Sequence, residues 1–229
     1  MSRRPIIDAG PALNFLAINR ERLLFGVLGR IATPETVAAE VMRKSRTDRR
    51  FSAVQRTWPK LTPNWIEVLS DDITVELDRA VTRISALPTA ERKAQAKDLG
   101  EVMVVAHAAI AAEAGHRVIA IVDDQGGARL ATAEQRRLVR LRAQGHPVGD
   151  IVLVNTVTIL ARAAGTPLLP DRAAMRAVYA RLRECDDGLL PIEQTPLIST
   201  ELWAARHSLV IGGSRAGAVT VIGGRSRSH

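Results

Sequence analysis

The sequence of 229 residues has one cysteine and few aromatic side chains. Cys185 has no second cysteine to pair with, so an intramolecular disulfide is excluded and a reducing compartment is expected. Aromatic residues make up 3% of the chain, which argues against a nucleic-acid surface built on base stacking. A nucleic acid bound by this chain is therefore expected to be held through its phosphate backbone.

Long apolar runs and an N-terminal apolar segment are also lacking. The most apolar helical stretch, residues 102–112, is interrupted by His107, so no membrane-spanning segment and no membrane partner is expected. The N-terminus passes from Arg3 and Arg4 almost directly to Asp8, which leaves no apolar region of a signal peptide. The sequence thus predicts a cytoplasmic protein.

Positive charge is in excess. Thirty-two Lys and Arg residues against 24 Asp and Glu residues give a formal net charge of +8. Such a charge favours a polyanionic partner, because Lys and Arg that face phosphates release counterions. An arginine-rich composition alone gives the same excess, so the charge is compatible with RNA but does not identify it.

Strands and helices alternate along the chain. Strands are expected at residues 4–8, 65–69, 117–122 and 150–154, and helices at residues 12–17, 34–44, 76–84, 98–114, 128–144, 156–164, 172–185 and 199–207. Thr33 is expected to cap the second helix, Trp58-Pro59 to form a turn, and Asp98 to cap the long helix that Gly115 ends. Alternation of this kind predicts an α/β fold with a parallel sheet covered on both faces.

Acidic residues gather where these strands end. Asp8 ends the first strand, and Asp123 and Asp124 end the strongest one. Glu40 and Glu101 lie on helices that reach the same edge of the sheet, where open parallel sheets bind their ligands. Carboxylates that converge repel each other unless cations neutralise them, and oxygen ligands suit Mg²⁺ or Mn²⁺.

Each of these acids also has a purely structural interpretation. Asp98 and Glu101 have the spacing of a helix capping box, and Asp123-Asp124 fits a turn between strand and helix. Glu40 alone is typical of a solvated helix face, and Asp8 of a helix cap. The case for chemistry rests on all of them meeting at one edge.

Four segments together resemble the PIN domain family: residues 6–11 (IIDAGP), 33–41 (TPETVAAEV), 99–102 (LGEV) and 122–129 (VDDQGGAR). The resemblance implies a three-layer α/β/α fold with about five parallel strands and a Mg²⁺- or Mn²⁺-dependent endoribonuclease. It assigns Asp8, Glu40, Glu101 and Asp124 as catalytic and metal-binding, with Asp123 as an additional or alternative metal ligand. Metal-activated water would attack the phosphorus in line.

The last of these segments resembles a bacterial, toxin-type branch of the family. That resemblance implies an antitoxin protein as a partner, and a homodimer is common in the family. It also implies a PIN-like domain over residues 1–192, with a core at about 1–150 and a long insertion at about 45–96. Residues 193–229 are then a C-terminal helix and a tail rich in Gly, Ser and Arg.

Two features depart from the family pattern. Ala9 and Gly10 stand where a hydroxyl side chain is common, and the insertion is longer than in compact members. They keep open a non-catalytic module that binds RNA or protein, and a nuclease acting on branched DNA is a third reading. A basic run follows the second predicted helix and is either a solvated helix end or a surface that binds the RNA backbone. It consists of Arg43, Lys44, Arg46, Arg49 and Arg50.

Overall fold

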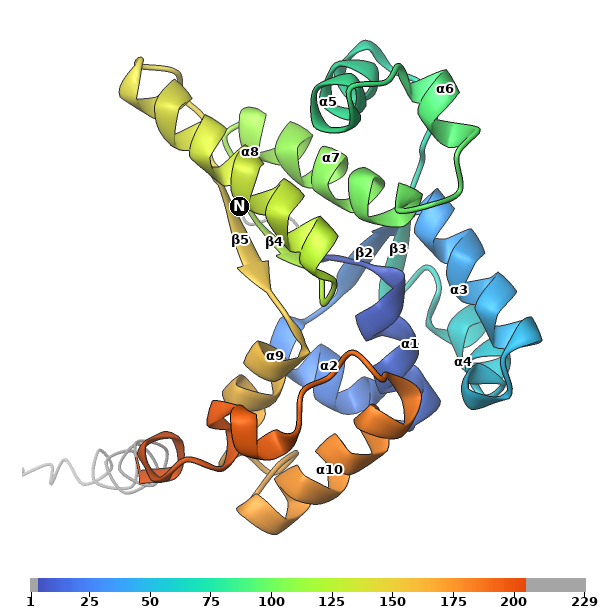
Figure 1. The fold of residues 1–229 in the computed structure, drawn as a ribbon, viewed down its shortest axis with the longest axis vertical. Coiled ribbons are helices and arrows are strands. Elements are labelled where there is room, and N and C mark those ends of the chain that lie inside the picture. The colour runs from blue at the N-terminus through green and yellow to red at the C-terminus, as the bar shows by residue number, and fades with distance from the viewer. Residues whose placement is uncertain (1–3, 205–229) are drawn as a thin grey trace, which may run out of the picture.

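The computed structural model describes residues 4–204. Within this range, five parallel strands form one sheet in the order β3-β2-β1-β4-β5 (Figure 1). The strands are β1 (Ile6–Ile7), β2 (Ile31–Pro34), β3 (Ile66–Leu69), β4 (Arg117–Ile121) and β5 (Asp150–Val154). Helices cover both faces, so the predicted three-layer α/β/α class is confirmed.

Helices lie on both sides of the sheet (Figure 1). The helical segments are α1 (Ala9–Ala17), α2 (Glu21–Leu28), α3 (Glu35–Thr47), η1 (Arg49–Phe51), α4 (Val54–Leu61), α5 (Val75–Ser85), α6 (Thr89–Lys93), α7 (Leu99–Glu113), α8 (Gln125–Ala143), α9 (Thr156–Ala163), α10 (Arg172–Cys185), η2 (Ile192–Gln194) and η3 (Pro196–Ile198). Helices α7 and α8 pack against one face of the sheet, while α1, α2, α9 and α10 lie on the other, and α3 to α6 lie beyond or beside them.

Helix α7 is buried on nearly all sides. Val104 and Ala108 face the main core, whereas Met103 and Ala106 pack against Leu77 of α5 in a second, smaller cluster. A helix that is apolar all round needs partners on every side, and the sheet, α5 and α8 supply them. The start of α7, which carries Glu101, is thereby held rigidly at the carboxyl edge of the sheet.

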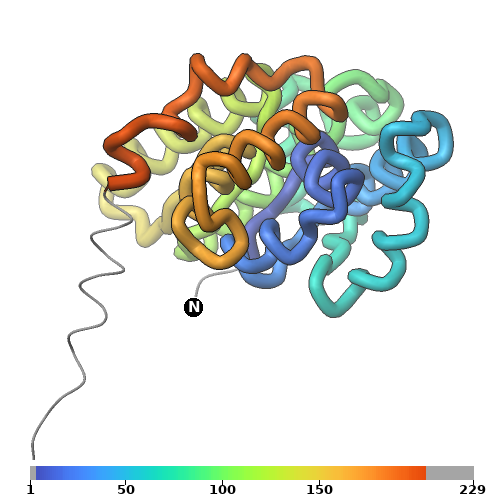
Figure 2. The backbone as a smooth tube through the Cα atoms, turned by 90° about the horizontal axis from the view of Figure 1, so that it is seen from below, coloured from blue at the N-terminus to red at the C-terminus, as the bar shows by residue number. Residues whose placement is uncertain are grey.

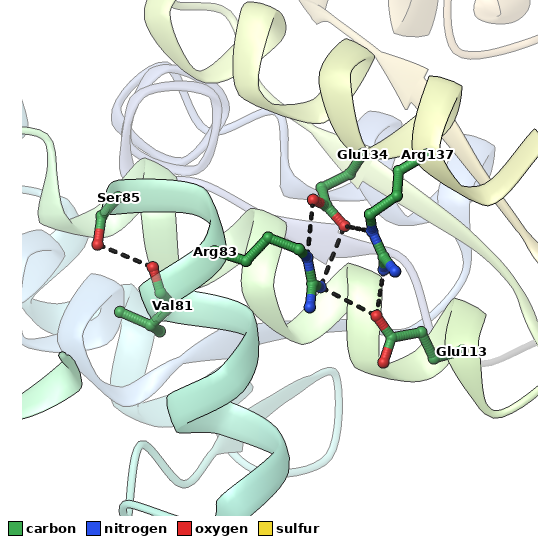
Figure 3. A network of polar contacts seen from close by, with 6 residues as sticks. All are labelled: Val81, Arg83, Ser85, Glu113, Glu134 and Arg137. Atoms are coloured by element: carbon green, nitrogen blue, oxygen red, sulfur yellow. Dashed lines mark hydrogen bonds and ion pairs between the residues drawn. The ribbon is translucent and has the colours of Figure 1, made fainter. Parts of the chain in front are cut away.

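A network of ion pairs joins the same three helices (Figure 3). Arg83 of α5 contacts both Glu134 of α8 and Glu113 of α7. Arg137 contacts the same two carboxylates. Because the Glu134 side chain is 6% exposed, these partners are what make its burial tolerable.

Three local predictions are wrong. Thr33 does not cap a helix: it lies in β2, and its hydroxyl donates a hydrogen bond to the carbonyl oxygen of Ile7 over 3.0 Å. Trp58 and Pro59 lie inside α4 rather than in a turn. Asp98 has a left-handed conformation and caps nothing with its side chain. Strand β2 and helix α2 were not predicted from the sequence pattern.

The segment after α10 passes close to α1 (Figure 2). Asn14 of α1 donates a hydrogen bond to Asp186 over 2.7 Å, and the Tyr179 hydroxyl donates to the carbonyl oxygen of Leu190 over 2.8 Å. The predicted helix at 199–207 is described only as far as residue 204, and the predicted tail lies outside the described residues. Among the described residues, no helix is long and apolar enough to cross a membrane.

Candidate functional site

A cavity of about 1230 Å³ opens at the carboxyl edge of the sheet. Asp8 reaches it from the end of β1 and Glu40 from α3, while Glu101 reaches it from the start of α7. Asp123 and Asp124 reach it from the end of β4. All five acids predicted from the sequence border this one cavity. The edge of a parallel sheet therefore does bring together residues that are more than a hundred positions apart in sequence.

The first pair of carboxylates meets at Gly100. A Cβ atom placed on this glycine would lie 3.2 Å from Asp8 Oδ1 and 3.2 Å from Glu40 Oε2. Gly100 is itself buried. The missing side chain thus leaves the space into which both carboxylates project.

The second pair meets at Gly126. A Cβ atom there would lie 2.7 Å from Asp124 Oδ1 and 3.4 Å from Glu101 Oε2. Asp124 also caps α8, accepting hydrogen bonds from the backbone N–H groups of Gly126 and Gly127. Asp124 therefore has a structural role as the N-cap of α8, which the sequence did not predict, and the same carboxylate borders the cavity.

Asp123 has a different environment from its neighbour. Its carboxylate accepts hydrogen bonds from the backbone N–H and the hydroxyl of Thr156, over 2.7 and 2.6 Å. Burial raises the pKa of Asp123 above its usual range. Asp123 thus fastens β4 to the start of α9, which leaves Asp124 as the more accessible acid of the two.

Burial and mutual repulsion oppose ionisation of two of these acids. Burial raises the pKa of Asp8 to about 6, and the Glu40 carboxylate contributes to the rise. Burial also raises the pKa of Glu101 to about 7, with further contributions from Asp124 and Asp8. Carboxylates with raised pKa values in one cleft are typical of functional sites.

Basic side chains border the cavity as well. Lys44 forms an ion pair of 2.8 Å with Glu40, and Arg43 and Arg129 line the cavity. Of the predicted basic run, Arg43 and Lys44 reach this cavity. Arg46, Arg49 and Arg50 do not line it, and Arg50 is held by Asp48 and by the carbonyl oxygen of Cys185.

Two polar connections at this edge were not predicted. Asp71, which follows β3, accepts hydrogen bonds from the backbone N–H of Thr36 over 2.7 Å and from His107 over 2.8 Å. It thereby joins α3, which carries Glu40, to α7, which carries Glu101. Its place just after a predicted strand was a signal available in the sequence. The second connection is the hydrogen bond that Asp186 accepts from Asn14. Asp186 follows no predicted strand, so the sequence held no such signal for it.

The oxygen donors suit a hard divalent cation, and the space at Gly100 and Gly126 lies between pairs of them. In the arrangement seen over residues 4–204, however, no three Asp, Glu, His or Cys side chains are grouped closely enough to hold a metal ion. The carboxylates lie in two pairs, Asp8 with Glu40 and Glu101 with Asp124. One cation bound by carboxylates of both pairs therefore requires side chains to rotate.

Comparisons of the chain with models of protein families, with curated proteins and with solved structures found no match. The resemblance to the PIN family therefore rests on the four sequence segments.

Proposed function

We propose that this chain is a Mg²⁺- or Mn²⁺-dependent endoribonuclease of the PIN type. The observation that supports the proposal best is the convergence of Asp8, Glu40, Glu101 and Asp124 on one cavity at the carboxyl edge of the sheet. Burial and the neighbouring carboxylates raise the pKa values of Asp8 and Glu101, and a divalent cation would relieve the repulsion among these groups.

Asp8, Glu40, Glu101 and Asp124 are the residues that would hold the metal. When bound, Mg²⁺ or Mn²⁺ supplies a water of lowered pKa and neutralises charge on the phosphate. Asp8 and Glu101 must release their protons to act as ligands, because the raised pKa values leave part of each group protonated near neutral pH. Lys44 pairs with Oε1 of Glu40, whereas Oε2 lies at the space above Gly100.

RNA is the proposed substrate because the family resemblance implies it, and the net charge of +8 is compatible with a polyanionic substrate. Arg43 and Arg129 border the acidic cavity, and in this proposal their guanidinium groups contact phosphates of the substrate. The toxin role, the antitoxin partner and a homodimer follow from the family resemblance and belong to this proposal.

The test is RNA cleavage in Mn²⁺ by two variants of the same helix. Glu40→Gln removes a carboxylate from the cavity, whereas Glu35→Gln removes one from the exposed first turn of α3. The proposal predicts that Glu40→Gln lowers the cleavage rate by at least about a hundredfold, as loss of a catalytic electrostatic contact typically does. Glu35→Gln should cleave like the wild type, and equal rates for all three proteins would refute the proposal.

A second candidate function is a non-catalytic module that binds RNA through the same fold. The observation that favours it is the arrangement of the site: Lys44 already neutralises Glu40, and among the described residues no three side chains form a metal-holding group. This alternative predicts RNA binding without cleavage at any Mn²⁺ concentration.

A further inference from the structure

The acidic cavity has a neighbour on α8. A second hollow, of about 480 Å³, is bordered by Gln125, Ala128, Arg129, Thr132, Ala133 and Arg136. Gln125 and Arg129 border both hollows. The acidic cavity and the hollow on α8 are therefore adjacent and share these two residues.

The geometry of α8 sets two arginines along this surface. Arg129 and Arg136 are seven residues apart, which is two helical turns or about 10 Å along the axis. Both side chains are exposed. Ala133 between them is small and exposed, so a chain lying on the helix can approach the backbone closely at this position.

These two arginines differ from others on the same helix. Arg137 is engaged by Glu113 and Glu134, and Arg142 donates to the carbonyl oxygen of Gly149. Neither Arg129 nor Arg136 has an ion pair with another residue of the described range 4–204. Their charges are available to an anion that enters from the acidic site.

We propose that the surface formed by Gln125, Arg129, Thr132 and Arg136 carries the phosphate backbone of single-stranded RNA away from the acidic cavity. The inference rests on the proposed function, and it deepens that function by giving the substrate strand a path. Charge complementarity selects this occupant, since two unpaired guanidinium groups on one helix can each contact a phosphate of the same strand. Few aromatic residues are needed, because the contact is to the backbone and not to the bases.

The path also distinguishes the basic run of residues 43–50 from the arginines of α8. Arg46, Arg49 and Arg50, which the sequence suggested as RNA contacts, do not line either hollow. The structure separates the arginines of α8 into a paired group, with Arg137 and Arg142, and, within residues 4–204, an unpaired group, with Arg129 and Arg136.

The test measures binding of an end-labelled single-stranded RNA of mixed sequence to the full chain in EDTA, so that cleavage by a metal-dependent site does not interfere. The variants are Arg129→Ala, Arg136→Ala and the double variant. Arg140→Ala is the matched control, because Arg140 is an exposed arginine of α8 that borders neither hollow.

The path predicts that the double variant binds RNA about tenfold more weakly than the wild type at moderate salt. Each of the two substitutions should also reduce the slope of affinity against salt concentration by about 0.7, the value for one lost phosphate contact on a single strand. Arg140→Ala should keep both the affinity and the slope of the wild type. Equal binding by the double variant and Arg140→Ala would overturn the path, as would tighter binding of duplex DNA than of RNA.

Failure of the path and failure of the nuclease proposal are distinguishable. If the chain cleaves RNA in Mn²⁺ but binds RNA independently of Arg129 and Arg136, the proposed nuclease function stands and the proposed path is wrong. If the chain never cleaves RNA but the double variant loses RNA binding, the nuclease proposal is wrong. The path then stands as the RNA-binding surface of a non-catalytic module.

Discussion

Asp8 and Glu40 come from different elements, yet their carboxylates meet over the same glycine. Gly100, on a third element, leaves the space that a Cβ atom would fill at 3.2 Å from an oxygen of each. The site thus depends on an absent side chain as well as on charged ones. This relationship can be tested without removing any charge.

Gly100→Ala is predicted to weaken Mn²⁺ binding because the added methyl group crowds both carboxylates and also lies 3.3 Å from a methyl group of Val37. Gly10→Ala is the matched control, since Gly10 borders the same cavity but a Cβ atom there meets nothing within 4 Å. Calorimetric titration of Mn²⁺ into both variants checks the prediction. Equal Mn²⁺ affinities would show that the space at Gly100 does not serve metal binding.

Asp8→Asn is predicted to stabilise the metal-free chain in alkaline solution. Burial raises the folded-state pKa of Asp8 to about 6, from an ordinary value of 3.8. The folded protein therefore binds more protons than the unfolded one between these two values, and its stability falls as the pH rises through that window. Above it, the charged carboxylate destabilises the fold by up to about 3 kcal/mol, which the variant recovers.

Denaturation in urea without divalent metal, near pH 8 and again near pH 4, measures this effect. The gain in stability should be present at the higher pH and nearly absent at the lower one, where Asp8 is protonated in the folded state. Asp72→Asn, at an exposed position, should change the free energy of unfolding little at either pH. An Asp8→Asn variant that is less stable than the wild type near pH 8 contradicts the account.

Asp71→Ala is predicted to reduce both stability and Mn²⁺-dependent cleavage, because Asp71 joins Thr36 of α3 to His107 of α7. Loss of this buried acceptor leaves the N–H of Thr36 unpaired, at about 1–3 kcal/mol. Asp72→Ala alters the adjacent, exposed residue and should change neither property. Since Asp71 does not border the cavity, its effect on cleavage should lie mainly in the affinity for Mn²⁺.

Arg83→Ala is predicted to lower stability without affecting the site. It removes one partner of the buried Glu134 carboxylate (Figure 3), and breaking a buried ion pair destabilises by about 3–5 kcal/mol where no other partner remains. Arg137 still pairs with Glu134, so a loss of about 1–3 kcal/mol is expected. Arg79→Ala, at an exposed position one turn earlier on α5, is the control in the same denaturation experiment.

The sequence predicted most of the site because the carboxyl ends of parallel strands share one edge. That rule alone places Asp8 beside Asp123 and Asp124. The apolar run of β4 is also typical of a buried parallel strand, so this strand was predicted from the sequence. The prediction from the sequence was wrong at Thr33, because Thr-Pro-Glu has the pattern of a capped helix start. Pairing of β2 with β1 and β3 instead decides the conformation of Ala32 and Thr33.

Other local features depend on packing that no short pattern contains. Pro59 suggested a turn, but burial of Trp58 keeps both residues in α4. The connection of Asp71 to His107 joins residues 36 positions apart, and that of Asn14 to Asp186 joins residues 172 positions apart. Such pairs are set by the tertiary fold, so sequence spacing does not reveal them.

The central claim is that the carboxylate cluster holds a divalent cation. Calorimetric titration of Mn²⁺ into the wild type and Asp8→Asn tests it most directly, because the variant removes one charge and keeps the shape of the side chain. The account predicts saturable Mn²⁺ binding by the wild type, with proton release, and loss of that binding in the variant. Identical titrations for the two proteins, or no binding by the wild type, would contradict it.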